Sequence, residues 1–203
     1  MPRKFGTKQK LLETTLDLIW EHSYGSVSVD DICTRAGVLK GSFYHFFNSK
    51  SDLAVATLES YWEEFRRPQL DQMFSPLIPP IERLKLYCDQ LYENQKDRFD
   101  KTGRVCGCPI NSLGSELSSE EENVRRKSQD MAARVRAYIE SALRDALRDG
   151  VWHGRDVPRK ALELYSFVTG TLLLARINND LEMIKGVKSA MLRLLGLEVV
   201  LTK

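Results

Sequence analysis

The chain has 203 residues, of which 42% are hydrophobic and 29% are charged, and its formal net charge at neutral pH is +2. This composition excludes a disordered chain, and the small net charge excludes a protein that is basic over its whole surface. The longest uncharged run, residues 164–175, is well short of the roughly 20 residues that a membrane helix needs.

Helices are the only regular elements that the sequence predicts. Apolar residues recur at helical spacing over long stretches, and alternating segments rich in Val, Ile and Thr are absent. Ser28 and Ser49 are expected N-caps, and the glycines at 25, 37 and 150 are expected helix ends. We therefore predict an all-α fold of about nine helices, covering roughly residues 7–22, 29–36, 40–46, 49–65, 81–99, 110–117, 118–149, 158–177 and 181–195.

Two breaks are expected along this chain. Pro68 is predicted to kink or end the fourth helix, and the proline-rich segment 75–80 is the clearest linker. The pattern typical of DNA binding ends near residue 54. We therefore predict a helix-turn-helix domain over residues 1–54, and a helical ligand-binding and dimerisation domain over residues 55–203.

Basic residues gather in two N-terminal windows, although the whole chain is nearly neutral. Residues 3–10 hold four Lys or Arg side chains and no acid, and residues 32–51 likewise hold basic side chains without an acid. A local basic surface lets a small protein approach phosphate groups without being basic elsewhere. This distribution favours a nucleic-acid partner.

Residues 27–50 have the properties of a helix-turn-helix. Gly37 suits the tight turn between two short helices, and the second helix would lie in the major groove with its first residues facing the bases. Lys40 and Ser42 could contact a base, while Gly41 lets the backbone approach. The phosphate contacts are expected from the N-terminus of the preceding helix and from the basic and phenolic side chains further on, namely Ser28, Tyr44, His45 and Lys50.

The same segment resembles the DNA-binding domain of the TetR family. Residues 32–47 fit the pattern I-x-x-x-A-G-V-x-x-G-x-F-Y-x-x-F, and residues 48–53 fit the x-x-K-x-x-L that follows it. The resemblance covers about residues 8–54. It implies an all-α homodimer with a C-terminal ligand-binding domain, and usually repression relieved by a small molecule.

The resemblance also implies roles for individual residues. The base-reading positions of the family fall at Leu39, Lys40, Gly41 and Ser42, and its phosphate-contacting positions at Tyr44, His45 and Lys50. Leu39 departs from the polar residue that is common there, which suggests an apolar contact such as one with a thymine methyl group.

A second, shorter resemblance involves residues 107–117. This segment is similar to the G-C-x-x-x-x-x-x-x-E segment of one branch of the family, whose repressors respond to reactive electrophiles or to small unsaturated acids. The likeness would place Cys108 near the ligand pocket. Cys108 could then be an electrophile sensor, activated by the helix that follows or by Arg104. The alternatives are a small apolar packing role, the commonest one for a free cysteine, and a metal ligand, which a lone Cys-x-Cys without a second pair does not favour.

The C-terminal part of the chain predicts the remaining partners. The aromatic side chains of Trp62, Tyr87 and Tyr138 are candidates for the lining of an effector pocket, although most aromatics are expected in the core. The last two helices are expected to pair with those of a second copy, because the segment from residue 164 onward is apolar on most sides. We expect a homodimer on a pseudo-palindromic operator, with a small-molecule effector and no other cofactor.

Other classes of protein are less well supported. The sequence contains no glycine-rich phosphate loop, no His-Glu-x-x-His and no Gly-x-Ser-x-Gly motif, so an enzyme is not expected. A helical dimerisation or carrier module is a further alternative, which the basic N-terminus disfavours. The four cysteines show no disulfide framework, and acids interrupt the apolar stretch after the basic start, so we expect no secretory signal, no membrane association and a cytoplasmic location.

Overall fold

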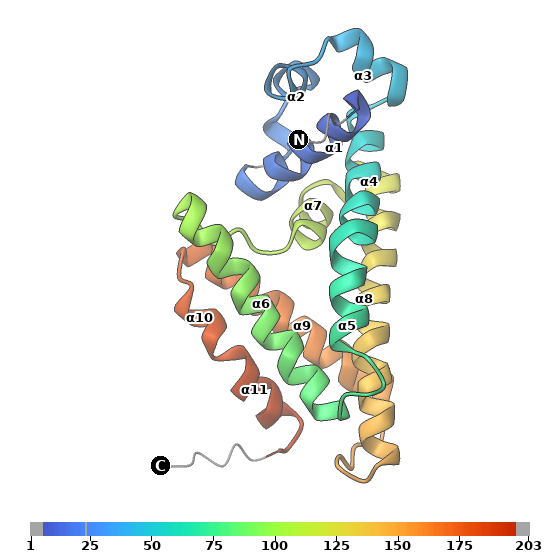
Figure 1. Ribbon diagram of the computed structural model, residues 1–203, viewed down its shortest axis with the longest axis vertical. Coiled ribbons are helices and arrows are strands. Elements are labelled where there is room, and N and C mark those ends of the chain that lie inside the picture. The colour runs from blue at the N-terminus through green and yellow to red at the C-terminus, as the bar shows by residue number, and fades with distance from the viewer. Residues whose placement is uncertain (1–5, 23, 198–203) are drawn as a thin grey trace. The chain divides into compact units, whose positions relative to one another are not determined.

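The computed structural model describes residues 6–22 and 24–197 (Figure 1). Helices cover most of these residues and no strand occurs among them, so the predicted all-α fold is confirmed. Some of the helical segments follow one another without a break, so that two or three of them correspond to one of the nine predicted helices. The elements are α1 (Thr7–Glu21), the 3-10 turn η1 (Tyr24–Ser26), α2 (Val29–Ala36), α3 (Lys40–Phe46), α4 (Lys50–Tyr61), the π-helical η2 (Trp62–Arg66), α5 (Arg67–Met73), α6 (Pro80–Thr102), α7 (Pro109–Leu117), α8 (Glu122–Arg148), α9 (Val157–Asn178), α10 (Glu182–Lys185) and α11 (Val187–Leu194).

The start and end of α2 follow from the side chains at its termini. The Ser28 hydroxyl accepts a hydrogen bond from the Asp31 backbone N–H at 3.1 Å, and the Ser28 N–H donates to the Asp31 carboxylate at 2.8 Å. This reciprocal pair is a capping box. Gly37 ends the helix at φ +64°, a conformation that glycine adopts without steric cost.

Pro68 does not end the helical path in which it lies. α4 passes into the five-residue π-helical segment η2, and α5 follows at once with Pro68 as its second residue. A proline is tolerated in the first turn of a helix because the N–H that it lacks is not required there. The change of helical type just before Pro68 allows the helical path to continue to Met73.

The predicted last helix, residues 181–195, is also corrected. It consists of α10 and α11, which are separated by Gly186. Glycine lowers helix stability because it loses the most backbone freedom on folding, and here it serves both as the end of α10 and as the residue before α11.

The chain forms two compact units. Unit 1 comprises residues 1–67 and 109–132, and unit 2 comprises residues 68–108 and 133–203. These units follow the packing of the chain, whereas the predicted division at residue 54 is one of function, and that division stays a prediction. Unit 1 nevertheless shows that α7 and the first part of α8 pack with the N-terminal helices.

Unit 1 is built around α1, which contacts α2, α3, α4 and α7. The side chains at its centre come from four helices and are almost completely buried. They are Leu11 and Ile19 from α1, Ile32 from α2, Phe43 from α3, and Leu53 and Leu58 from α4. Because α3 contributes the buried Phe43, its opposite face is left outward.

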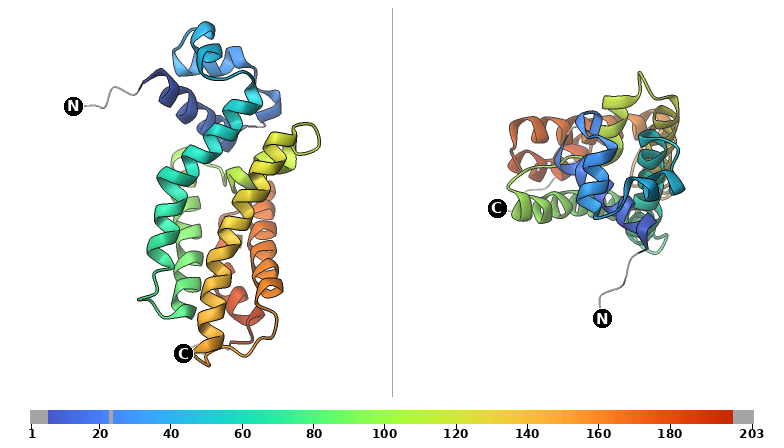
Figure 2. Two further views of the ribbon diagram at one scale, coloured as in Figure 1. Left: turned by 90° about the vertical axis from the view of Figure 1, so that its right-hand side faces the viewer. Right: turned by 90° about the horizontal axis from the view of Figure 1, so that it is seen from above.

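In unit 2, α10 and α11 lie beside both α6 and α9 (Figures 1 and 2). Leu84, Leu164 and Met191 are among the buried side chains that these helices contribute. No helix within residues 6–22 and 24–197 has the length and apolar character to cross a membrane.

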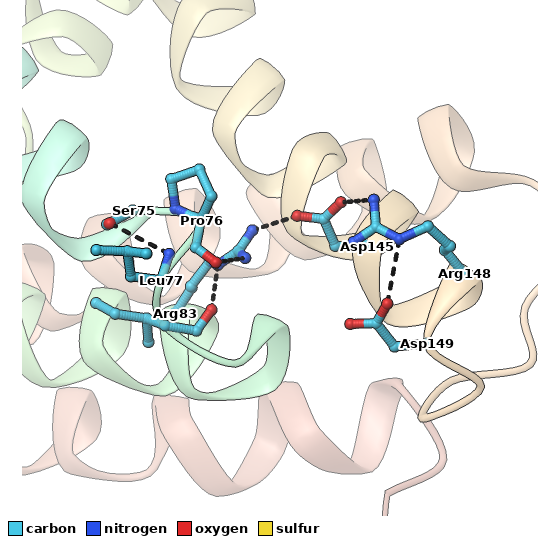
Figure 3. Close-up of polar contacts among 8 residues, drawn as sticks. Ser75, Pro76, Leu77, Arg83, Asp145, Arg148 and Asp149 are labelled. Atoms are coloured by element: carbon cyan, nitrogen blue, oxygen red, sulfur yellow. Dashed lines mark hydrogen bonds and ion pairs between the residues drawn. The ribbon is translucent and has the colours of Figure 1, made fainter.

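A buried arginine joins α6 to the loop before it and to α8 (Figure 3). Arg83 donates to Asp145 at 2.5 Å, to the Ile78 carbonyl at 2.7 Å and to the Pro76 carbonyl at 3.2 Å. The Arg83 side chain is only 4% exposed and that of Asp145 is 19% exposed. The guanidinium thus satisfies a carboxylate and two backbone carbonyls in a place where water has little access.

Candidate DNA interface

The outward face of α3 carries small or protruding side chains that make few contacts with the rest of the chain. Leu39, which directly precedes α3, is 81% exposed. A Cβ atom built on Gly41 would meet no other atom within 4 Å, so the backbone at this position is open to the outside. Lys40 is exposed and Ser42 is half-buried. The four predicted base-reading positions therefore occur together at the N-terminal end of α3.

Tyr44 and His45 extend the same surface. Tyr44 is 54% exposed, and its ring lies edge-on against the buried Phe43, with 5.0 Å between the ring centroids. The exposed His45 ring lies edge-on against Phe46 at 4.7 Å. These aromatic contacts orient both side chains, while their polar atoms remain at the surface, as contact with a phosphate requires.

Lys40 is held by an acid on the neighbouring helix. Its ammonium group lies 2.9 Å from the carboxylate of Asp30 in α2, and this carboxylate raises the pKa of Lys40. Both side chains are largely exposed, so the ion pair contributes little to stability. The ion pair instead orients Lys40, because it holds the ammonium group beside α2 while further N–H donors of this group remain for a base.

Ser28 lies at the exposed N-terminus of α2 but is occupied by its capping box. Its hydroxyl and its N–H are both engaged with Asp31, and these hydrogen bonds lower the pKa of the Asp31 carboxyl group. The predicted phosphate contact would have to share this helix end with a carboxylate. Ser28 thus has a clear structural role, and its contact with DNA stays a prediction.

Lys50 has different partners from those that the sequence predicts. Its ammonium group donates to the backbone carbonyls of Tyr24, Gly25 and Val27 at 3.0, 3.1 and 2.8 Å. It also lies 4.9 Å from the centroid of the Tyr24 ring. An ammonium group has three N–H donors, and in this structure all three face carbonyls. Lys50 therefore braces the turn between α1 and α2, and its contact with a phosphate stays a prediction.

The backbone N–H groups of the same turn also have a partner, which the sequence does not predict. The Glu116 carboxylate, at the end of α7, accepts hydrogen bonds from the backbone N–H groups of Tyr24, at 3.1 Å, and of Gly25. In the sequence, Glu116 is the glutamate of the G-C-x-x-x-x-x-x-x-E segment. The glutamate follows Gly25 by 91 residues, so no local signal could reveal the contact.

The predicted ligand residues fall into both units. Trp62 is a buried residue of unit 1. In unit 2, the buried Tyr87 and the half-buried Tyr138 both contact Phe74, with ring centroids 5.9 and 5.5 Å from that of Phe74. The Tyr138 hydroxyl also donates to Asp71. Tyr87 and Tyr138 are thus brought together by an aromatic cluster, which by itself is compatible with a core role.

The loop before Cys108 is held by side chains of unit 2. Gly107 has φ +74°, and its N–H and carbonyl pair with the buried Gln95 amide at 2.9 and 2.7 Å. Asn179 accepts from the Val105 N–H at 2.9 Å. Cys108 directly precedes α7 in the chain and is the only cysteine that is not buried, whereas Cys33, Cys88 and Cys106 are buried. Burial raises the pKa of Cys88 to about 12, so its thiol stays protonated at neutral pH.

Comparison with known protein families accounts for both parts of the chain. Residues 11–57 match the family described as bacterial regulatory proteins of the tetR family, and residues 80–191 match the tetracyclin repressor-like C-terminal domain. The chain belongs to the TetR family. The resemblance predicted from residues 32–53 is thereby confirmed, and this TetR family member is a DNA-binding transcriptional regulator.

Its similarity to characterised relatives extends beyond the DNA-binding helices. It is 26% identical to the HTH-type transcriptional repressor NemR of Escherichia coli K12 over 177 residues, which are 87% of each chain. It is 36% identical to the transcriptional regulator AcuR of Cereibacter sphaeroides over 118 residues, 58% of this chain and 52% of AcuR. The crystal structure of reduced E. coli NemR aligns with a TM-score of 0.79 and 25% identity, over 93% of this chain and 97% of that one.

Proposed function

We propose that this TetR family regulator is a repressor that binds a pseudo-palindromic operator as a homodimer and is released from it by a small molecule or a reactive electrophile. The observation that carries the proposal is the exposed N-terminal end of α3, with its open backbone at Gly41. A helix with such an end can enter the major groove closely enough for its side chains to reach base edges.

The proposed contacts divide into two kinds. Lys40 and Ser42 donate to bases, Gly41 allows the close approach, and Leu39 makes an apolar contact in the groove. Tyr44 and His45 contact phosphates and fix the register of α3 on the duplex. Their exposure at one surface of unit 1 supports this division.

Dimerisation is proposed to use α9 together with α10 and α11. Large apolar side chains of α9 are exposed although the opposite face of the helix is buried, and they recur at helical spacing. They are Leu162, Leu173, Leu174 and Ile177, the last of which is 68% exposed. An exposed apolar stripe of this kind favours burial against a second copy. In such a dimer the two α3 helices would bind half-sites about 34–36 Å apart.

The DNA-binding proposal is tested with a 30-bp duplex selected by the wild-type protein from a random pool. We expect two protomers per duplex and an affinity that falls steeply with salt, because each phosphate contact releases counterions. Tyr44→Ala should weaken binding about tenfold and leave the slope of the salt dependence unchanged, because a neutral hydroxyl contacts a phosphate without neutralising it. Glu120→Ala is a matched control, since Glu120 is exposed and lies far along the chain in the loop before α8. Selection of no sequence above non-specific binding would contradict the proposal and favour a helical carrier module.

Effector sensing is proposed to involve Cys108. It is the accessible cysteine, it directly precedes α7, and the loop that contains it is fixed by Gln95 and Asn179. Because the loop before Cys108 is held by hydrogen bonds, a modification of Cys108 is expected to displace the start of α7 rather than the loop. The other role open to Cys108 is simple packing at the start of this helix.

Treatment with N-ethylmaleimide distinguishes the sensor role of Cys108 from a packing role. This electrophile reacts by addition of a thiol across its carbon–carbon double bond. We expect treatment to release the wild-type protein from the selected duplex, and Cys108→Ser to remain bound after the same treatment. Cys106→Ser is the matched control, because Cys106 lies in the same loop but is buried, and it should respond as the wild type does. If Cys108→Ser is released as readily as the wild type, the sensor role is excluded and a non-covalent effector remains.

A further inference from the structure

The turn between α1 and α2 is held from two sides by opposite charges. On one side, Lys50 from the first turn of α4 donates to the backbone carbonyls of Tyr24, Gly25 and Val27. On the other side, the Glu116 carboxylate from α7 accepts the backbone N–H groups of Tyr24 and Gly25. The carbonyls and the amides of one short turn are therefore both paired with ionised side chains.

The tyrosine of this turn adds a third attachment. The Tyr24 side chain is fully buried, and its hydroxyl donates to the Lys50 carbonyl at 3.0 Å. The ring, the amide and the carbonyl of one residue thus contact two different helices, α4 and α7. The turn cannot shift without breaking contacts to both of them.

Gly25 shows how closely Glu116 approaches. A Cβ atom at this position would lie 2.7 Å from the Glu116 Oε1 atom, a separation that real side chains do not show. The φ of Gly25 is not positive, so its backbone conformation alone does not require glycine. A side chain at residue 25 would therefore require the Glu116 carboxylate to move.

We propose that Glu116 is a positioning residue for DNA binding: by fixing the α1–α2 turn, it sets the placement of α2 and α3 before the operator is met. The inference rests on the proposed use of α3 to bind DNA. Hydrogen bonds to an ionised carboxylate are about twice as strong as neutral ones. DNA-binding helices that are already ordered in the free protein lose less conformational entropy on binding. DNA affinity is thereby made to depend on α7, the helix that follows Cys108 in the chain.

The first test compares wild type, Glu116→Ala and the control Glu120→Ala on the selected 30-bp duplex. We expect Glu116→Ala to bind about tenfold more weakly, the equivalent of losing one charge-assisted hydrogen bond. The slope of log affinity against log salt should stay unchanged, because Glu116 neutralises no phosphate. In the free protein, hydrogen exchange should accelerate at the amides of Tyr24 and Gly25, while the amides of α9 keep their protection.

A double-mutant cycle with Gly25→Ala separates this positioning role from a general loss of stability. A methyl group at residue 25 should displace the carboxylate, so that Gly25→Ala alone weakens DNA binding. In the Glu116→Ala background, the same change should have little further effect, because the contact that it disrupts is already absent. Additive effects of the two changes would overturn the inference.

The outcomes also distinguish this inference from the proposed function. If wild type and Glu116→Ala bind the selected duplex equally, the inference fails while the proposed function stands. If the wild type selects no duplex at all, the proposed function fails and the inference fails with it. Should Glu116→Ala not fold, Gly25→Ala alone decides, because an affinity equal to that of the wild type would overturn the inference.

Discussion

Replacing Gly41 with alanine is expected to stabilise the fold and to weaken operator binding. Gly41 lies in α3, its φ is not positive, and no atom lies within 4 Å of the added Cβ position. Alanine is better than glycine in a helix by about 0.5–1 kcal/mol. The free energy of unfolding should rise by up to this amount, because Gly41 lies in the first turn of α3 and no described side chain opposes the methyl group.

The same methyl group would lie where α3 is proposed to approach the bases. Disturbing one base-facing position in a specific complex typically costs about 1–3 kcal/mol, and each 1.4 kcal/mol corresponds to a tenfold change in affinity. We expect the affinity of Gly41→Ala for the selected duplex to fall between about tenfold and a hundredfold. Chemical denaturation and equilibrium DNA binding measure the two effects on one sample.

Ser141→Ala is the control for this prediction. Ser141 is an exposed residue of α8 in unit 2, where alanine also improves helix propensity, although by less than at a glycine. We expect Ser141→Ala to be slightly more stable than the wild type and to bind DNA with unchanged affinity. Wild-type binding by Gly41→Ala would contradict the proposed placement of α3 in the groove.

The second large effect is expected at Arg83. Arg83→Leu removes the buried partner of the Asp145 carboxylate and the donor to two backbone carbonyls. Breaking a buried ion pair from one side costs about 3–5 kcal/mol when the remaining charge has no other partner, and the cost here should lie near the lower end because Asp145 keeps the exposed Arg148. We expect the free energy of unfolding to fall by this amount in a denaturation experiment.

Arg148→Leu provides a matched control on the same carboxylate. Arg148 lies 2.7 Å from Asp145, but its side chain is 68% exposed. Exposed ion pairs typically contribute less than about 1 kcal/mol, so Arg148→Leu should be close to the wild type in stability. Equal losses in the two variants would contradict a special role for the buried arginine (Figure 3).

The effect of Arg83 should also depend on pH. The hydrogen bond from Arg83 is the main reason why the pKa of Asp145 lies below its usual value. A carboxyl group with a lowered pKa in the folded state stabilises the fold above its unfolded pKa, and this stabilisation is lost as the pH falls through the folded pKa. The stability difference between wild type and Arg83→Leu should therefore be largest near neutral pH and narrow below about pH 4.

Local signals explain why the DNA-binding helices could be predicted closely. Ser28, Gly37 and Ser49 mark helix boundaries through contacts within a few residues of themselves, and such contacts are visible in the sequence. The bounds of α3, residues 40–46, agree with the prediction for the same reason. The expected helix end at Pro68 was wrong, because the effect of a proline depends on where the neighbouring helical segments begin.

Contacts between distant parts of the chain could not be predicted. Lys50 fits the family motif, and only the folded structure shows its ammonium group turned toward carbonyls that precede it by 23 to 26 residues. Glu116 reaches the same turn from α7. Burial of the cysteines is a further example, because only the folded structure shows that Cys106 is buried and Cys108 is half-buried.

The two-segment make-up of unit 1 has a practical consequence for hybrid regulators. Grafting residues 1–67 of this protein onto the sensory part of another regulator would leave residues 109–132 behind. The recipient would have to supply a carboxylate in the place of Glu116, or the amides of Tyr24 and Gly25 would lose their acceptor. A transferable DNA-binding unit therefore consists of both segments. When a recipient is chosen for a new genetic circuit, the first property to check is whether it has a carboxylate at the position of Glu116.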